Sequence, residues 1–191
     1  QDEHGLLFIY DLDKNSITRQ IPFGADGDYE GVARVNRAIY ILRSDEVLIE
    51  LTDYTSSGSP INFYETGIPG RDAEGLCYDP KNNRLLVAPK EISSDNPSAQ
   101  ATRHIFGFNL ASKTLIKGTV MDFDIRKIEE YAVSNNVKVP MKGKKGEVKV
   151  PDINMKITAI GIHPITYKLY AISGPERLFF VFDMNGNIES L

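Results

Sequence analysis

The chain has 191 residues, of which 41% are hydrophobic and 25% are charged, the composition of an ordinary globular protein. The net charge of -4 gives no sign of a nucleic-acid partner, and no apolar stretch approaches the roughly 18 residues of a membrane-spanning helix. The single cysteine, Cys77, excludes an internal disulfide, and its apolar neighbours predict a buried, unreactive thiol.

The chain begins with a pattern typical of two paired strands. Residues 8–12 are mostly apolar and are followed by a polar turn and a returning strand from Ile17. The same pattern recurs at 106–115 and 180–188, and more weakly at 47–51. Because Asn185-Gly186 in the last copy is a strong hairpin signal, we interpret each copy as an antiparallel pair of strands.

The clearest repeat is the phrase Asp28-Tyr29-Glu30-Gly31-Val32, which returns as Asp72-Ala73-Glu74-Gly75-Leu76, 44 residues further on. Each copy opens an apolar, strand-like run. A period of about 40 to 50 residues is that of one four-stranded propeller blade. The sequence therefore predicts an all-β fold, a β-propeller of four-stranded antiparallel blades.

The strand pattern also predicts where the blades begin and end. The expected ranges are 1–23 for the outer half of a first blade, followed by 28–66, 72–120 and 156–191. The last range opens with a strand, 157–162, that lacks the acidic pair. About three and a half to four blades are few for a closed ring of four to eight. We therefore expect residues 1–191 to form a single propeller domain or fragment of a longer, five- or six-bladed propeller.

Residues 122–150 do not fit the blade pattern and are predicted to be an insertion. Ile125, Ile128 and Ala132 fall at helical spacing, and Asp122 or Asp124 could cap the start of a short helix. The following stretch, 137–150, is rich in lysine and contains glycines, which predicts an exposed loop or long hairpin.

Strand direction predicts which of the charged residues meet. In an antiparallel blade, the start of the first strand and the turn between the second and third strands lie at the same edge. Glu30 and Glu74 begin first strands, so we expect them to join the second turns in an acidic, funnel-like mouth near the axis. The candidate ligand-binding residues of this mouth are Glu3, Arg43, Glu46, Lys90, Glu91 and Glu176.

Three interpretations of the acidic mouth stay open. Glu30 and Glu74 could be ligands of a Ca2+ ion, which takes six to eight oxygen ligands. One carboxyl group could be a general acid or base if crowding raises its pKa. The carboxylates could instead have a structural role, accepting backbone amides and pairing with Arg43 and Lys90. No residue is singled out as catalytic.

Residues 72–88, together with the stretches 160–164 and 169–173, resemble the SdiA-regulated, YjiK-like β-propeller family of bacterial envelope proteins. Residues 1–5 are also similar to that family's first blade, and the resemblance covers most of the chain except 122–150. It implies a larger propeller, located in the periplasm or at the cell membrane, and supplies no catalytic residues. Related six-bladed propellers hold calcium with Glu, Asn and Asp, a pattern that only Glu30 and Glu74 match loosely.

We therefore predict a non-enzymatic envelope module for binding or scaffolding, whose acidic mouth takes a cation. Its expected partner is a small molecule or an envelope protein of unknown identity, and its one candidate cofactor is Ca2+. The first alternative is a calcium-dependent hydrolase of the lactonase type, with Glu30 or Glu74 as ligand or base. The second is a structural interaction module that uses the 122–150 insertion. We expect no nucleic-acid partner and no transmembrane segment.

Overall fold

The computed structural model describes residues 3–91 and 101–191, which form antiparallel β-sheets and a helix. Three sheets have four strands, in the orders β3-β4-β5-β6, β7-β8-β9-β10 and β13-β14-β15-β16. Two smaller sheets pair β1 with β2 and β11 with β12. The predicted all-β class and the four-stranded antiparallel sheets are confirmed.

The first six strands are β1 (Leu6–Asp11), β2 (Ser16–Pro22), β3 (Tyr29–Val35), β4 (Ala38–Arg43), β5 (Val47–Leu51) and β6 (Ile61–Glu65). The next sheet comprises β7 (Arg71–Asp79), β8 (Arg84–Glu91), β9 (Thr102–Asn109) and β10 (Thr114–Asp124). The chain continues with α2 (Ile125–Ser134), β11 (Met141–Lys142), β12 (Val150–Pro151), β13 (Ile157–Ile162), β14 (Leu169–Ser173), β15 (Leu178–Phe182) and β16 (Ile188–Ser190).

Strand β10 runs to Asp124 and so includes the first three residues of the predicted 122–150 insertion. The reason is the alternation of burial at the end of β10. Met121 and Phe123 are buried while Asp122 between them is exposed, a period of two that continues the strand.

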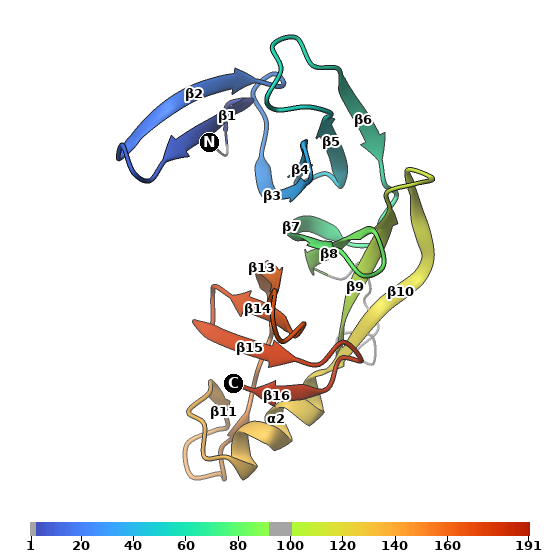
Figure 1. Cartoon of the computed structure of the whole chain (residues 1–191). Coiled ribbons are helices and arrows are strands. Elements are labelled where there is room, and N and C mark those ends of the chain that lie inside the picture. Colours follow the sequence, from blue (N-terminus) through green and yellow to red (C-terminus); the bar gives the residue numbers. More distant parts are fainter. Residues whose placement is uncertain (1–2, 92–100) are drawn as a thin grey trace.

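The four-stranded sheets radiate like a fan from their first strands (Figure 1). The inner strand β7 contacts β3 on one side and β13 on the other, whereas β6 and β10 lie on the outer side. This is the arrangement of propeller blades, in which the first strand of each blade is nearest the axis. The described sheets span part of a circle (Figure 1).

Each inner strand contains a β-bulge near its start. The pairing register skips Glu30 in β3, Glu74 in β7 and Thr158 in β13. A bulge bends the strand and re-aims the side chain of the extra residue. The repeated Asp-x-Glu-Gly phrase therefore marks one structural position, at which the last sheet has a threonine.

The glycine of the repeat is explained by the close approach of the next inner strand. A Cβ atom added to Gly31 would lie 2.7 Å from the Cβ of Leu76, and one added to Gly75 would lie 3.1 Å from a side-chain carbon of Ile160. Contacts this short are not tolerated by real Cβ atoms without movement of the neighbour. Glycine at these positions thus lets β7 and β13 pack against the preceding sheet.

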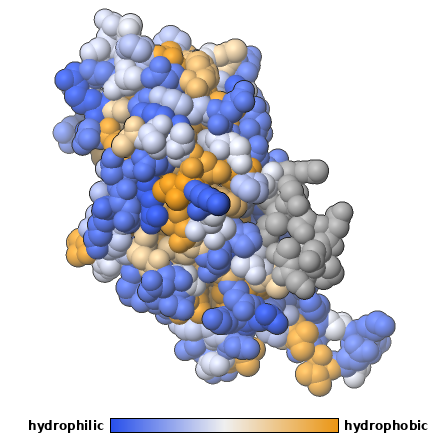
Figure 2. Space-filling view, turned by 90° about the vertical axis from the view of Figure 1, so that its right-hand side faces the viewer, coloured by the Kyte–Doolittle hydropathy of each residue, from blue (hydrophilic) through white to orange (hydrophobic). Residues whose placement is uncertain are grey.

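The hydrophobic core lies between neighbouring sheets rather than in one centre. One cluster joins β3–β5 to β7–β9 around Leu42, Leu85 and Phe108. A second joins β7–β10 to β13–β15 and includes the buried Phe123 and Phe180. The face that carries the outer strands is mostly hydrophilic, with an apolar patch at mid-height (Figure 2). Each sheet therefore depends on its neighbours for burial of its apolar faces.

Two buried carboxylates, Glu50 and Asp79, connect neighbouring sheets through hydrogen bonds. We call them the latch carboxylates. Glu50 accepts hydrogen bonds from Tyr40, Tyr64 and Asn62 of its own sheet and from Lys113 of the next, at 2.5 Å.

Asp79, whose residue is fully buried, accepts from Asn82 and Arg84 at 2.8 Å each and from the Tyr167 hydroxyl of the following sheet. Lys81 also lies over the Tyr167 ring, 3.5 Å from its centroid. Asp79 therefore holds its own turn together and attaches the next sheet to it.

Helix α2 begins where the spacing of its apolar residues predicts. Asp124 is the N-cap residue and accepts a hydrogen bond from the backbone N–H of Arg126 at 3.0 Å. Ile125, Ile128 and Ala132 form its buried face, as predicted. In the part of the chain that the structure describes, no helix has the length and hydrophobicity of a bilayer span.

Candidate functional site

The starts of β3 and β7 meet the turn between β4 and β5 at one edge of the sheets. Tyr29 pairs with Arg43 across β3 and β4. The Ser44 amide donates to the Asp28 carbonyl at 2.9 Å, and the Ala73 amide donates to the Ser44 carbonyl at 3.2 Å. Backbone hydrogen bonds therefore hold both copies of the repeat at this edge, as strand direction predicts.

Four carboxylates and one ammonium group gather there, and we call Asp28, Glu30, Asp72, Glu74 and Lys90 the axial cluster. Lys90 forms an ion pair with Glu74, whose side chain is only 10% exposed. The hydrogen bond to Glu74 raises the pKa of Lys90, and the charges of Asp72 and Glu30 raise it further. The ammonium group is thus held charged among carboxylates.

Glu30 differs from Glu74 in its surroundings. It is exposed at the surface of β3, whereas Glu74 lies between two neighbouring inner strands. Partial burial of the carboxyl group raises the pKa of Glu30, and the negative charges of Glu74 and Asp28 raise it further, while Lys90 opposes them. The carboxyl group of Glu30 is therefore more easily protonated than that of an isolated glutamate.

The sequence prediction included Glu30, Glu74 and Lys90 but did not select Asp28 or Asp72 as site residues. The signal was present, since each aspartate opens a copy of the repeat. Their contribution depends on the bulges and on a left-handed backbone at Asp72, with φ of 52°, which turn the start of the strand toward the axial edge.

Arg43 and Glu46 lie at the same edge but have other partners. Arg43 donates two hydrogen bonds to Asp45, at 2.7 and 2.8 Å, so its guanidinium group neutralises that carboxylate. Burial raises the pKa of Glu46, and the charges of Asp45 and Asp72 add to the effect. Glu46 therefore extends the negative potential of the axial cluster.

Glu3 and Glu176 have partners outside the axial cluster. Glu3 is exposed, and its backbone carbonyl accepts from the Gly27 amide at 2.9 Å. Glu176 accepts a hydrogen bond from Ser173 and interacts electrostatically with Arg103. Glu91 ends β8, but its side chain lies outside the described part of the structure.

A calcium site needs more oxygen ligands than Glu30 and Glu74 supply by themselves. Within residues 3–91 and 101–191, no group of three or more His, Cys, Asp and Glu side chains is arranged to hold a metal ion. Calcium needs six to eight oxygen ligands, and one oxygen of Glu74 is already occupied by Lys90. Calcium binding by Glu30 and Glu74 thus stays a prediction that these residues alone do not support.

Cys77 is buried, as its apolar neighbours predict. Burial raises the pKa of its thiol to about 12, so the reactive thiolate form is not populated near neutral pH. The cysteine belongs to the core between β7–β10 and β13–β15 and takes no part in a site.

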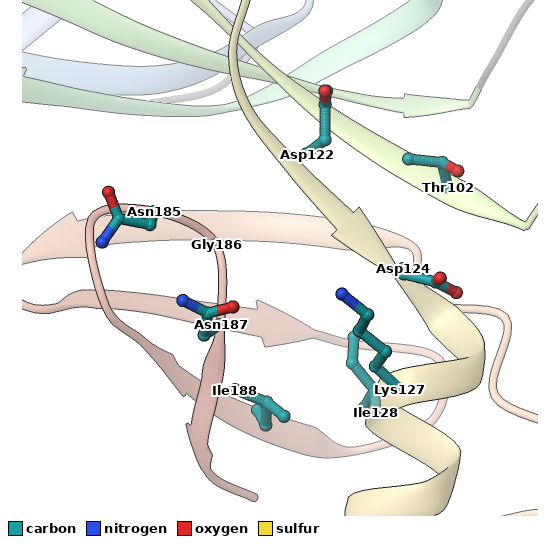
Figure 3. Close-up of a pocket in the computed structure, with 9 residues that line it drawn as sticks. All are labelled: Thr102, Asp122, Asp124, Lys127, Ile128, Asn185, Gly186, Asn187 and Ile188. Atoms are coloured by element: carbon teal, nitrogen blue, oxygen red, sulfur yellow. The ribbon is translucent and has the colours of Figure 1, made fainter.

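A cavity of about 310 Å³ lies away from the axial cluster, where the end of β10 and the first turn of α2 face the β15–β16 turn (Figure 3). Its lining includes Asp122, Asp124, Lys127 and Asn187. The sequence pattern indicated only a helix cap and a hairpin turn for this region. Nothing in the spacing of 122–128 and 185–188 predicts that the two segments meet.

No protein-family model and no curated protein sequence matches this chain. Among solved structures, the crystal structure of glutaminyl cyclase from Myxococcus xanthus is similar, with a TM-score of 0.56 at 14% sequence identity. The match covers 98% of this chain and 67% of that chain. A chain of the Mitotic Checkpoint Complex matches with a TM-score of 0.48 at 11% identity, over 95% of this chain and 70% of that one.

At these levels of identity the similarity to the glutaminyl cyclase concerns the fold alone, and the second match is too distant to support a conclusion. The sheet arrangement and this similarity agree with each other. The resemblance to the envelope family stays a prediction. The chain has an all-β, propeller-type fold whose axial edge carries a cluster of carboxylates around one lysine.

Proposed function

We propose that this chain is a non-enzymatic binding module whose axial cluster recognises a ligand carrying a primary ammonium group. The observation that carries the proposal is the charge of the cluster, four carboxylates against the ammonium of Lys90. Glu74 already pairs with the Lys90 ammonium, so the remaining negative charge favours a second ammonium group, from a ligand, beside Glu30. An amine or a lysine side chain of an envelope protein is the class of partner that fits.

Three features favour an ammonium ligand over a metal ion. An ammonium group needs about three hydrogen-bond acceptors, which Glu30, Asp28 and their backbone neighbours can supply. The described carboxylates do not form a metal-ligating group. Glu30 is exposed and can be reached from solvent, while Glu74 is shielded and paired. The proposed roles are therefore ligand binding for Glu30 and positioning of Lys90 for Glu74.

The test is residue-resolved NMR of the protein titrated with butylamine, with a lysine-containing tripeptide and with Ca2+. We expect the two amines to shift the amide resonances of residues 28–31 and 72–75. Glu30→Gln should weaken the binding of each amine by about tenfold. The matched control is Asp13→Asn, which removes one negative charge from an exposed turn remote from the cluster. It should leave amine binding unchanged.

Binding of Ca2+ without binding of amines would replace the proposal by the metal interpretation. An equal loss of amine affinity in Asp13→Asn and Glu30→Gln would show that the binding is a non-specific effect of charge. Turnover of a lactone or ester panel that Glu30→Gln abolishes would favour the hydrolase alternative and overturn the non-enzymatic assignment.

A further inference from the structure

The chain segment between β12 and β13 is fixed to the blades. Ile153 and Met155 are buried in the core that lies between β7–β10 and β13–β15. Arg103 of β9, which is also buried, donates hydrogen bonds to the backbone carbonyls of Asn154 and Met155, the second at 3.1 Å. The Ile153 amide donates to Glu129 Oε1 of α2, also at 3.1 Å. A sheet and a helix therefore hold this segment in place.

The fixed segment is the base of a hairpin, residues 137–150, which we call the basic hairpin. Its neck is the two-stranded sheet of β11 and β12. An ion pair between Lys142 and Asp152, with 2.8 Å between the charged atoms, joins the two sides of the neck. Every residue from 141 to 150 is exposed. The basic hairpin therefore projects into solvent beside α2, at one end of the fan of sheets (Figure 1).

The basic hairpin differs in charge from the rest of the chain. Its charged residues are five lysines and a single acidic residue, Glu147, whereas the whole chain has a net charge of -4. The lysines are Lys138, Lys142, Lys144, Lys145 and Lys149. Apart from Lys142, they form no ion pair with any side chain in residues 3–91 and 101–191. Positive charge is thus concentrated on one projecting element and is available to a partner.

Apolar side chains are exposed among these lysines. Val148 is 89% exposed, Met141 is 50% exposed and Val150 is 47% exposed. A partner that attracts the lysines by charge alone does not cover these side chains. The surface of an anionic bilayer does both, because its phosphate groups attract lysines and the boundary of its acyl chains takes up apolar side chains. The combination of charge and exposed hydrophobicity therefore favours a membrane surface.

We propose that the basic hairpin binds the surface of a bilayer that contains anionic phospholipids. Its lysines lie at the headgroup phosphates, and Val148 and Met141 enter the boundary between headgroups and acyl chains. Because one short hairpin buries little apolar area, the attachment is weak, reversible and sensitive to salt. The fixed base gives the blades a defined orientation toward the membrane. This proposal is separate from the axial cluster and does not depend on its proposed function.

The test is co-sedimentation of the whole chain with vesicles of two compositions, phosphatidylcholine alone and an equimolar mixture of phosphatidylcholine and phosphatidylglycerol. We expect binding to the mixed vesicles at about 0.05 M NaCl and its loss at about 0.5 M NaCl, because salt screens the lysines from the phosphates. Binding to phosphatidylcholine alone should be at least about tenfold weaker. Soluble poly-L-glutamate serves as a polyanion without an apolar boundary and should bind more weakly than the mixed vesicles.

Two variants separate the charged from the apolar contribution. Lys144→Gln combined with Lys145→Gln should weaken binding to the mixed vesicles by about tenfold, through lost attraction to the phosphates. Val148→Ser should weaken it by about fivefold, through lost apolar burial. All three side chains are exposed, so the fold should be unaffected.

Each variant has a matched control at the other end of the chain or on a sheet. Lys14→Gln combined with Lys117→Gln removes two positive charges from exposed positions outside the basic hairpin. Leu12→Ser removes an apolar side chain that is 86% exposed in the turn between β1 and β2. Both controls should bind the mixed vesicles like the natural protein.

Equal binding to both vesicle compositions would show non-specific apolar adsorption and overturn the proposal. Equal losses in the hairpin variants and their controls would show an effect of overall charge or hydrophobicity and overturn it as well. Full binding by Val148→Ser, or binding of poly-L-glutamate as tight as that of the mixed vesicles, would indicate an acidic macromolecule as the partner instead of a membrane. No binding to the mixed vesicles at low salt would refute the proposal outright.

Discussion

Carboxylates lie at both edges of the sheets, but their surroundings differ. At the axial edge, the Glu30 residue is exposed, and partial desolvation of its carboxyl group together with the charges of Glu74 and Asp28 raises its pKa. At the opposite edge, Glu50 and Asp79 are buried and accept hydrogen bonds from several donors, some of them on the next sheet. Hydrogen bonds from Lys113 and the tyrosines outweigh burial and lower the pKa of Glu50 to about 2.

The role of a carboxylate here depends on the number of hydrogen-bond donors around it, rather than on its residue type or its place in a repeat. The latch carboxylates have their acceptor capacity filled by protein groups, so they connect sheets and cannot bind a ligand. The axial carboxylates share one ammonium among four groups and keep free capacity. Stability should therefore depend on the latch edge, and ligand binding on the axial edge.

Removal of a latch carboxylate should destabilise the fold more than any other change described below. Asp79→Ala removes the acceptor of Asn82, Arg84 and Tyr167 and leaves a largely buried guanidinium group without a partner. We expect it to lower the free energy of unfolding by roughly 3–5 kcal/mol, as breaking a buried ion pair does. Glu30→Ala at the axial edge should change it by about 0.5 kcal/mol or less.

Urea denaturation followed by circular dichroism measures both variants. Similar losses for Asp79→Ala and Glu30→Ala would show that the two edges do not differ in the way their surroundings indicate.

The next effect is a loss of stability in acid. The pKa of Glu50 is about 2 in the folded protein, below its ordinary value of 4.5. A lowered pKa means that the ionised carboxylate stabilises the fold above pH 4.5, and that this stability is lost as the pH falls from about 4.5 to 2. The loss attributable to Glu50 should be roughly 3 kcal/mol.

Melting temperatures between pH 5 and pH 2, in the natural protein and in Glu50→Gln, measure this effect. The variant should be less stable at neutral pH and show a flatter dependence on pH. Parallel pH curves for the two proteins would contradict the assignment of this acid sensitivity to Glu50.

The smallest effect concerns the glycine of the repeat, which lies beside the axial cluster but serves packing. Gly31→Ala would place a Cβ atom 2.7 Å from the Cβ of Leu76. We expect a loss of about 1–3 kcal/mol from overpacking. Gly161→Ala is the matched control, because no atom lies within 4 Å of the added Cβ. Equal stability of the two variants in chemical denaturation would refute the close approach of β3 and β7.

Much of the fold was predictable because its signals are local. The repeat located the starts of β3 and β7, the Asn185-Gly186 pair located the turn before β16, and the spacing of Ile125, Ile128 and Ala132 located α2. Strand direction also brought Glu30, Glu74 and Lys90 to one edge. These features follow from the period of strands and helices, which is written into neighbouring residues.

The contacts between sheets were not predictable in this way. Tyr167 reaches Asp79 across 88 positions in sequence, and Lys113 reaches Glu50 across 63. No local sequence pattern predicts either contact, because residues this far apart in sequence give no sign of which turns of successive sheets lie side by side. The cavity between α2 and the β15–β16 turn escaped prediction for the same reason.

The repeating antiparallel strands, the capped helix and the acidic residue at the start of two inner strands all follow from local patterns in the sequence. Which acidic groups have all their acceptor positions occupied by hydrogen bonds, and which remain available, depends on the three-dimensional packing of the sheets. The outcome depends on donors from other sheets, on bulges that turn Glu30 and Glu74, and on burial between inner strands. These are properties of packing, and a linear pattern of residue types does not contain them.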